Sequence, residues 1–111
     1  MKPNWINVDS VQQLTEILQK TTDKTNLFFK HSTRCSISSM ALKLFESDWK
    51  NIENVDCYFI DLISFRDVSN TIAQKTNIEH QSPQVIVLKN NNVIYYASHQ
   101  SIDAEKILNI I

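Results

Sequence analysis

The apolar residues of this chain fall into two kinds of pattern, short uninterrupted runs and longer stretches with helical spacing. The runs Leu27–Phe29 and Val85–Leu88 show no alternation with polar residues, which is typical of strands buried on both faces of a sheet. Residues 57–62, rich in aromatic and branched side chains, predict another strand. Helical spacing is clearest in one apolar stripe, formed by Ile37, Met40, Ala41, Leu44 and Phe45.

The remaining elements follow from the same patterns and from turn and cap residues. A helix from Val11 to about Lys20 begins at Ser10, which has capping-box spacing to Gln13. Asn90–Asn92 is expected to be a hairpin turn, because asparagine tolerates positive φ better than most residues. The other predictions are strands at 5–8, 26–31, 84–89 and 93–98, a helix from 64–67 to about 77, and a last helix capped by Ser101.

The order of these elements, (β)α-βαβα-ββα, predicts an α/β fold. The βαβ unit makes its strands parallel, whereas the hairpin strands are antiparallel, so the central sheet is mixed and helices flank both of its faces. This order is that of the thioredoxin-like fold, although a generic small α/β sandwich is also compatible with it. We find no repeat or linker, and we expect residues 1–111 to form a single thioredoxin-like domain.

Composition excludes several classes of function. The chain of 111 residues has no glycine, so it lacks the phosphate-binding loops and nucleophile elbow that need one. A net charge of -1 does not suggest a nucleic-acid or membrane partner. The N-terminus lacks the apolar run of a signal peptide, and no stretch approaches the ~18 apolar residues of a membrane span. We therefore expect a cytoplasmic protein whose two cysteines are reduced.

Cys35 is the leading candidate for chemistry because it lies where a predicted central strand ends and a helix begins. The unpaired N–H groups of a helix start stabilise a thiolate. Arg34 adds positive potential, and the hydroxyls of Thr33, Ser36 and Ser38 are candidate donors to the sulfur. The alternative is a buried, inert cysteine, which the polar flanking residues disfavour.

Three segments resemble a known family. The stretch 30–39, with Thr33-Arg34-Cys35-Ser36-Ile37-Ser38, is similar to the Thr-x-Cys-Pro-Ile-Ser signature of the monothiol bacilliredoxins of the bacilliredoxin C branch. The segment 81–85 resembles the family's cis-proline loop, and Ser98-His99 resembles the end of its last strand. The resemblance implies that Pro83 is cis, begins the hairpin and lies with Ser82 against Cys35, where a client would bind.

The resemblance also implies a function. Cys35 would attack the mixed disulfide between a client protein and bacillithiol, a low-molecular-weight thiol, and a second thiol would then regenerate Cys35. Bacillithiol is thus a co-substrate, and no bound cofactor or metal is implied. Ser38 stands where dithiol relatives carry a resolving cysteine, so a monothiol mechanism is expected. Ser36 replaces the family proline; it restores a backbone N–H and adds a hydroxyl near the sulfur.

Other interpretations stay open. The chain could be a thioredoxin-like interaction module that binds clients without turnover. It could also bind an iron–sulfur cluster between two subunits, although such binding normally needs glutathione and Gly-rich loops. We expect Cys57 to be a core residue, far from Cys35, and His80 to be a solvated loop residue that could approach the thiol. His31, His80 and His99 lack metal-site spacing. A monomer is expected because no further apolar face is evident.

Overall fold

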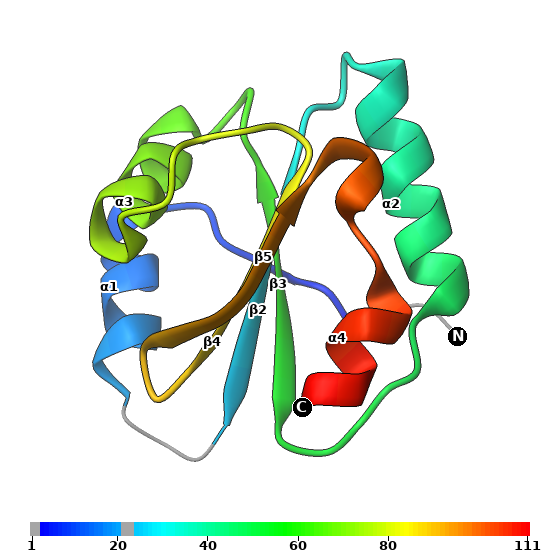
Figure 1. Ribbon diagram of the computed structural model, residues 1–111. Coiled ribbons are helices and arrows are strands. Elements are labelled where there is room, and N and C mark those ends of the chain that lie inside the picture. The colour runs from blue at the N-terminus through cyan, green and yellow to red at the C-terminus, as the bar shows by residue number, and fades with distance from the viewer. Residues whose placement is uncertain (1–2, 21–23) are drawn as a thin grey trace.

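The computed structural model describes residues 3–20 and 24–111, which build a five-stranded sheet between two layers of helices (Figure 1). The strand order is β1-β3-β2-β4-β5, where β1, β2 and β3 are parallel and β4 and β5 complete the sheet with antiparallel pairing. The mixed sheet is therefore confirmed. The strands are β1 (Ile6–Asn7), β2 (Thr25–His31), β3 (Val55–Asp61), β4 (Gln84–Lys89) and β5 (Asn92–Ser98).

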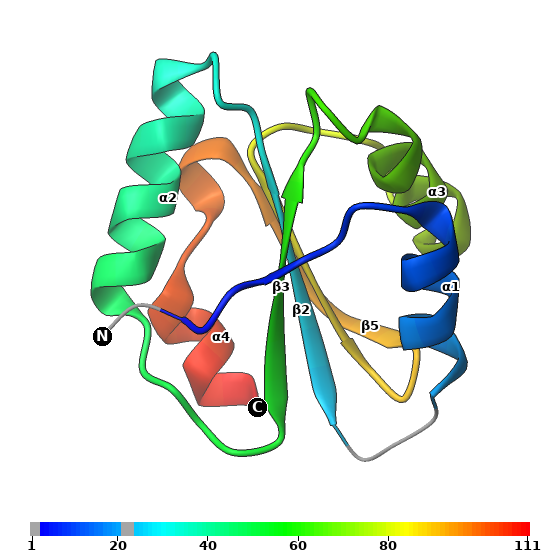
Figure 2. The ribbon, with the colours of Figure 1, turned by 180° about the vertical axis from the view of Figure 1, so that it is seen from behind.

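Helices cover both faces of this sheet, as predicted. One layer holds α1 (Val11–Gln19) and α3 (Arg66–Thr76), and the other holds α2 (Ser36–Asp48) and α4 (Ala104–Ile110). A short 3₁₀ helix, η1 (His99–Ser101), connects β5 to α4. Figure 2 shows the N-terminal segment crossing the outer edge of the sheet, from the side of α2 to α1.

The central strand β2 explains the uninterrupted apolar run. Leu27 and Phe29 pack under α2 and α4, whereas Phe28 packs on the opposite face under α1 and α3. All three side chains are fully buried, and burial of each contributes about 1.5–3 kcal/mol. A strand with both faces covered has no position left for polar alternation.

Asparagine takes the place of glycine at four of the five left-handed positions among the described residues, and His99 occupies the fifth. Asn90 and Asn91 have φ values of 52° and 63°, so the hairpin between β4 and β5 has the positive φ at both central residues that a type I′ turn needs. Asn77 ends α3 in the same conformation. The predicted hairpin turn is confirmed, although Asn92 already belongs to β5.

Two predicted boundaries were wrong. The last helix is capped by Asp103, whose carboxylate accepts the N–H groups of Glu105 and Lys106. Ser101 lies before it, because η1 occupies residues 99–101. The strand β3 begins at Val55 rather than Cys57, since its parallel pairing with β2 extends back to Thr25.

Candidate active site

Cys35 is the N-cap residue of α2, at the end of the turn that follows β2. Its N–H donates to the carbonyl oxygen of Ser32 at 3.2 Å, and its own carbonyl accepts the N–H of Ser39 at 3.0 Å. The thiol is free and partly exposed. The backbone therefore holds a reachable sulfur beside the positive end of the α2 dipole.

The residues around Cys35 divide into an exposed group and one buried residue. Thr33, Arg34, Ser36 and Ile37 are exposed. Ser38 is fully buried. No hydrogen bond among residues 3–20 and 24–111 ends on the Cys35 sulfur.

The Ser38 hydroxyl is engaged below the turn. It accepts the N–H of Ser32 at 3.0 Å and lies 2.8 Å from Nδ1 of His31. Its contacts thus tie the start of α2 to the end of β2. From the sequence, Ser38 was a candidate donor to the Cys35 sulfur. In the structure its hydroxyl instead holds the turn that carries Cys35.

His31 is a buried partner of this turn. Burial lowers the pKa of its imidazole, while the charges of Asp61 and Glu46 partly oppose that effect. A lowered pKa keeps the ring uncharged at neutral pH. The His31–Ser38 pair is therefore a neutral hydrogen bond beneath Cys35.

The Ser82–Pro83 peptide bond is cis. Lys30 pairs with Gln84 in the antiparallel ladder of β2 and β4, so Pro83 lies level with His31, next to the turn that carries Cys35. The Pro83 carbonyl accepts the N–H of His99 at 3.0 Å. The register thus brings Pro83, His99 and the Cys35 turn to one end of the sheet.

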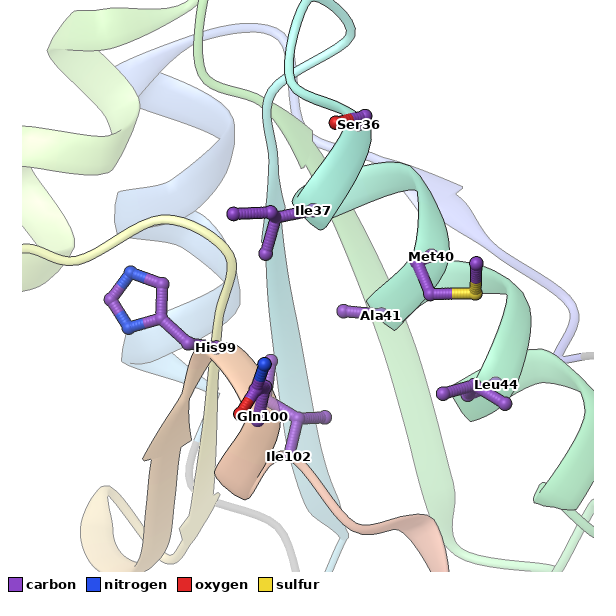
Figure 3. Close-up of a pocket in the computed structure, with 8 residues that line it drawn as sticks. All are labelled: Ser36, Ile37, Met40, Ala41, Leu44, His99, Gln100 and Ile102. Carbon is purple, nitrogen blue, oxygen red and sulfur yellow. The ribbon is translucent and has the colours of Figure 1, made fainter.

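An apolar groove of about 390 Å³ lies between α2 and η1, beginning at Ser36, the residue after Cys35. Figure 3 shows Ile37 and Ala41 projecting from α2 toward the segment with Gln100 and Ile102. The other lining residues are Met40, Leu44 and His99.

This groove corrects one expectation. Of the apolar stripe of α2, Ile37, Met40 and Leu44 are exposed by 56%, 60% and 59%, whereas Phe45 is buried. The reason is the orientation of α2: the side that packs on the sheet carries Ser38, Leu42, Phe45 and Trp49, so Ile37, Met40 and Leu44 lie on a neighbouring side that borders the groove. A further apolar face therefore exists, and the ground for expecting a monomer was wrong.

Cys57 is a core residue, as predicted. It is only 6% exposed and pairs in register with Leu27, toward the start of β2 and away from Cys35. Burial, with a contribution from Asp56, raises the pKa of its thiol to about 12. Cys57 is thus a protonated thiol in the core at neutral pH.

Sequence reasoning missed a polar cluster beside the Pro83 loop. Lys30 is fully buried in β2, and its ammonium group contacts Ser69 and His80. The imidazole of His80 is therefore held by α3 and β2 and is not the solvated ring that we expected. The available signal was a lysine directly after Phe29, in a run predicted to be buried on both faces.

Metal ligands and membrane spans were also sought in the described part of the chain. No group of three or more His, Cys, Asp or Glu side chains there could hold a metal ion. None of the helices built from those residues is both long and apolar enough to cross a bilayer.

Similar proteins place this architecture in a class. A structure described as that of a candidate oxidoreductase with a thioredoxin fold matches with 28% identity and a TM-score of 0.80, over 95% of this chain and 91% of the other. The thioredoxin NaTrxh of Nicotiana alata matches with 15% identity and a TM-score of 0.74, over 100% and 92%. The Malassezia sympodialis thioredoxin matches with 22% identity and a TM-score of 0.68, over 99% and 89%. The fold and its cysteine define a thioredoxin-fold thiol oxidoreductase.

The family can be stated more narrowly. Residues 6–107 match the family model described as monothiol bacilliredoxin BrxC. The chain belongs to this monothiol bacilliredoxin family, which confirms the resemblance seen in the sequence.

Proposed function

We propose that this protein removes bacillithiol from bacillithiolated client proteins by monothiol exchange at Cys35. One observation carries the proposal: Cys35 is a reachable thiol at a helix N-terminus, whereas Cys57 is buried at a distant register position. The protein therefore offers one nucleophilic sulfur without a resolving partner beside it. Family membership supports the choice of bacillithiol as the co-substrate.

The proposed reaction has two exchange steps. The Cys35 thiolate attacks the bacillithiol sulfur of the client's mixed disulfide, the disulfide bond breaks, and the client leaves as a thiolate that takes up a proton. A free bacillithiol thiolate then attacks the bacillithiol sulfur on Cys35. This second step releases the Cys35 thiolate and bacillithiol disulfide, so electrons and atoms balance.

The neighbouring residues have separate proposed roles. Arg34 supplies positive charge and Thr33 and Ser36 supply hydroxyls at the exposed side of the sulfur. Ser38 holds the turn from below. Ser82 and Pro83 form the edge against which the client backbone lies. Ile37 and the groove that follows it accept an apolar side chain of the client.

The alternative function is a non-catalytic interaction module of the same fold. The apolar groove beside Cys35 favours client binding in either case, so the two functions differ only in the reactivity of Cys35.

Intact mass spectrometry tests the reaction. Reduced protein exposed to bacillithiol disulfide is expected to gain one bacillithiol, on Cys35, and to lose it again in free bacillithiol. The Cys57→Ser variant should give the same adduct, because the buried thiol does not react. Oxidised glutathione serves as the comparison for thiol specificity. An unreactive protein, or an adduct on Cys57, argues for the interaction module.

A charge in the groove should weaken client binding selectively. We expect Met40→Glu to raise KM for a bacillithiolated protein about tenfold, since it replaces an apolar contact by a charge that must stay hydrated. The rate with bacillithiol disulfide should not change. Ser47→Glu, on an exposed part of α2 outside the groove, is the matched control. Equal effects of the two variants on KM contradict client binding in the groove.

A further inference from the structure

One charged side chain next to the proposed client site is buried, and no carboxylate of the described residues pairs with it. Lys30 is 0% exposed, and its Nζ donates to the Ser69 carbonyl at 3.0 Å and lies 3.3 Å from Nδ1 of His80. The Ser69 hydroxyl lies 3.0 Å from the same Nδ1 atom. Two elements, β2 and α3, thus converge on one nitrogen of His80.

These contacts determine the protonation state of His80. An ammonium group only donates hydrogen bonds, so Nδ1 of His80 must accept, and the ring proton stays on Nε2. A second proton on Nδ1 would place two cations in contact and remove the acceptor that Lys30 uses. The arrangement therefore requires a neutral His80.

His80 belongs to the segment that leads into Ser82–Pro83. The side-chain N–H of Gln84 donates from Nε2 to the Glu79 carbonyl at 3.0 Å. The segment is therefore held at its start by Gln84 and at His80 by Lys30 and Ser69. Gln84 is also the ladder partner of Lys30. The position of Pro83 beside the Cys35 turn is thus coupled to the Lys30–His80 contact.

We propose that Lys30 and Ser69 position the Ser82–Pro83 loop through a neutral His80, and that protonation of His80 releases the loop and weakens client binding at Cys35. The effect on client binding rests on the proposed function, whereas the coupling between the loop and the His80 imidazole does not depend on it. Lys30, Ser69 and His80 are positioning residues, because the structure places them on the loop rather than on the sulfur.

The charges around His80 support this assignment. Burial lowers the pKa of its imidazole, and the cations Lys30 of β2 and Arg66 of α3 lower it further. Gln84 of β4 is neutral, Glu79 is exposed, and β3 presents apolar Ile60 on this face, while its Asp61 acts on His31. The loop is therefore held at neutral pH and released as pH falls through the lowered pKa of His80.

Nuclear magnetic resonance tests the coupling without any turnover. We expect the His80 ring in the wild type to titrate below the ordinary value of 6.5, and the amide signals of Glu79, Gln81 and Ser82 to move with the same midpoint. Lys30→Met should raise that midpoint, whereas Lys89→Met, on an exposed residue of β4, should not. A wild-type midpoint at or above 6.5, or one that ignores Lys30→Met, overturns the proposal.

Kinetics with a bacillithiolated client test the consequence, and need no variant of Lys30. The His80→Asn variant retains an acceptor near the position of Nδ1, and this acceptor does not titrate. We expect KM of the wild type to rise about tenfold as the pH falls from 7.5 to below the His80 midpoint found by NMR, and KM of His80→Asn to stay constant. Any change of kcat with pH should be the same in the two proteins. His80→Ala should have the raised KM at both pH values. If KM of the wild type and KM of His80→Asn change equally with pH, release of the loop is contradicted. If no protein shows turnover but His80 titrates as expected, only the proposed function is contradicted.

Discussion

Cys35→Ser is expected to reduce release of bacillithiol from a client to the uncatalysed background. A serine hydroxyl is not ionised at neutral pH and cannot form the mixed disulfide, so the first exchange step is lost. The measurement is the rate at which a bacillithiolated client regains its free thiol in the presence of bacillithiol. The fold should be unchanged, because Cys35 makes only backbone hydrogen bonds in the structure.

Cys57→Ser provides the control for this experiment. The Cys57 thiol is buried, and burial raises its pKa to about 12, so it supplies no thiolate at neutral pH and its replacement should leave turnover per folded molecule unchanged. If activity survived in Cys35→Ser and disappeared in Cys57→Ser, the nucleophile would be Cys57, and the assignment of Cys35 would be contradicted.

Ser38→Ala is expected to lower the free energy of unfolding by about 2 kcal/mol or more. The alanine leaves the Ser32 N–H and Nδ1 of His31 without the partner that both share, and a buried polar group without a partner costs about 1–3 kcal/mol. The same loss loosens the turn before Cys35, so the exchange rate should also fall. Urea unfolding and the client assay measure the two effects.

Ser39→Ala is the matched control, because Ser39 is the next residue of α2 and is exposed. Its effect should stay within about 0.5 kcal/mol, as is usual for surface substitutions. Similar stability of the two variants would show that the Ser38 hydroxyl does not hold the turn.

Burying the charged side chain of Lys30 lowers the stability of this fold. Burial lowers the pKa of its ammonium group from 10.5 to about 8, which corresponds to a cost on the order of 3 kcal/mol for the charged form. That is a considerable part of the 5–15 kcal/mol by which domains are typically stable. A methionine would avoid this cost, so the contacts of Lys30 with Ser69 and His80 are best explained by what they position.

Local patterns were sufficient for much of this protein. An uninterrupted apolar run can only be accommodated where both faces of a strand are covered, which identified β2 and β4 as central strands. The run of asparagines at 90–92, in a chain that has no glycine, predicted the hairpin turn, because few other residues accept positive φ. The position of Cys35 between such a strand and an amphipathic stretch placed its thiol at a helix start.

Contacts between distant segments were beyond reach of the sequence. The exposed part of the α2 stripe depends on which side of the helix packs on the sheet, and periodicity alone is the same for a covered and an uncovered face. The hydroxyl direction of Ser38 depends on the position of His31 below the turn. Lys30 and His80, 50 positions apart, meet only because the ladder pairs Lys30 with Gln84. Secondary structure and the nucleophile follow from local chemistry, whereas the groove and the polar cluster follow from register and packing, which only the tertiary structure decides.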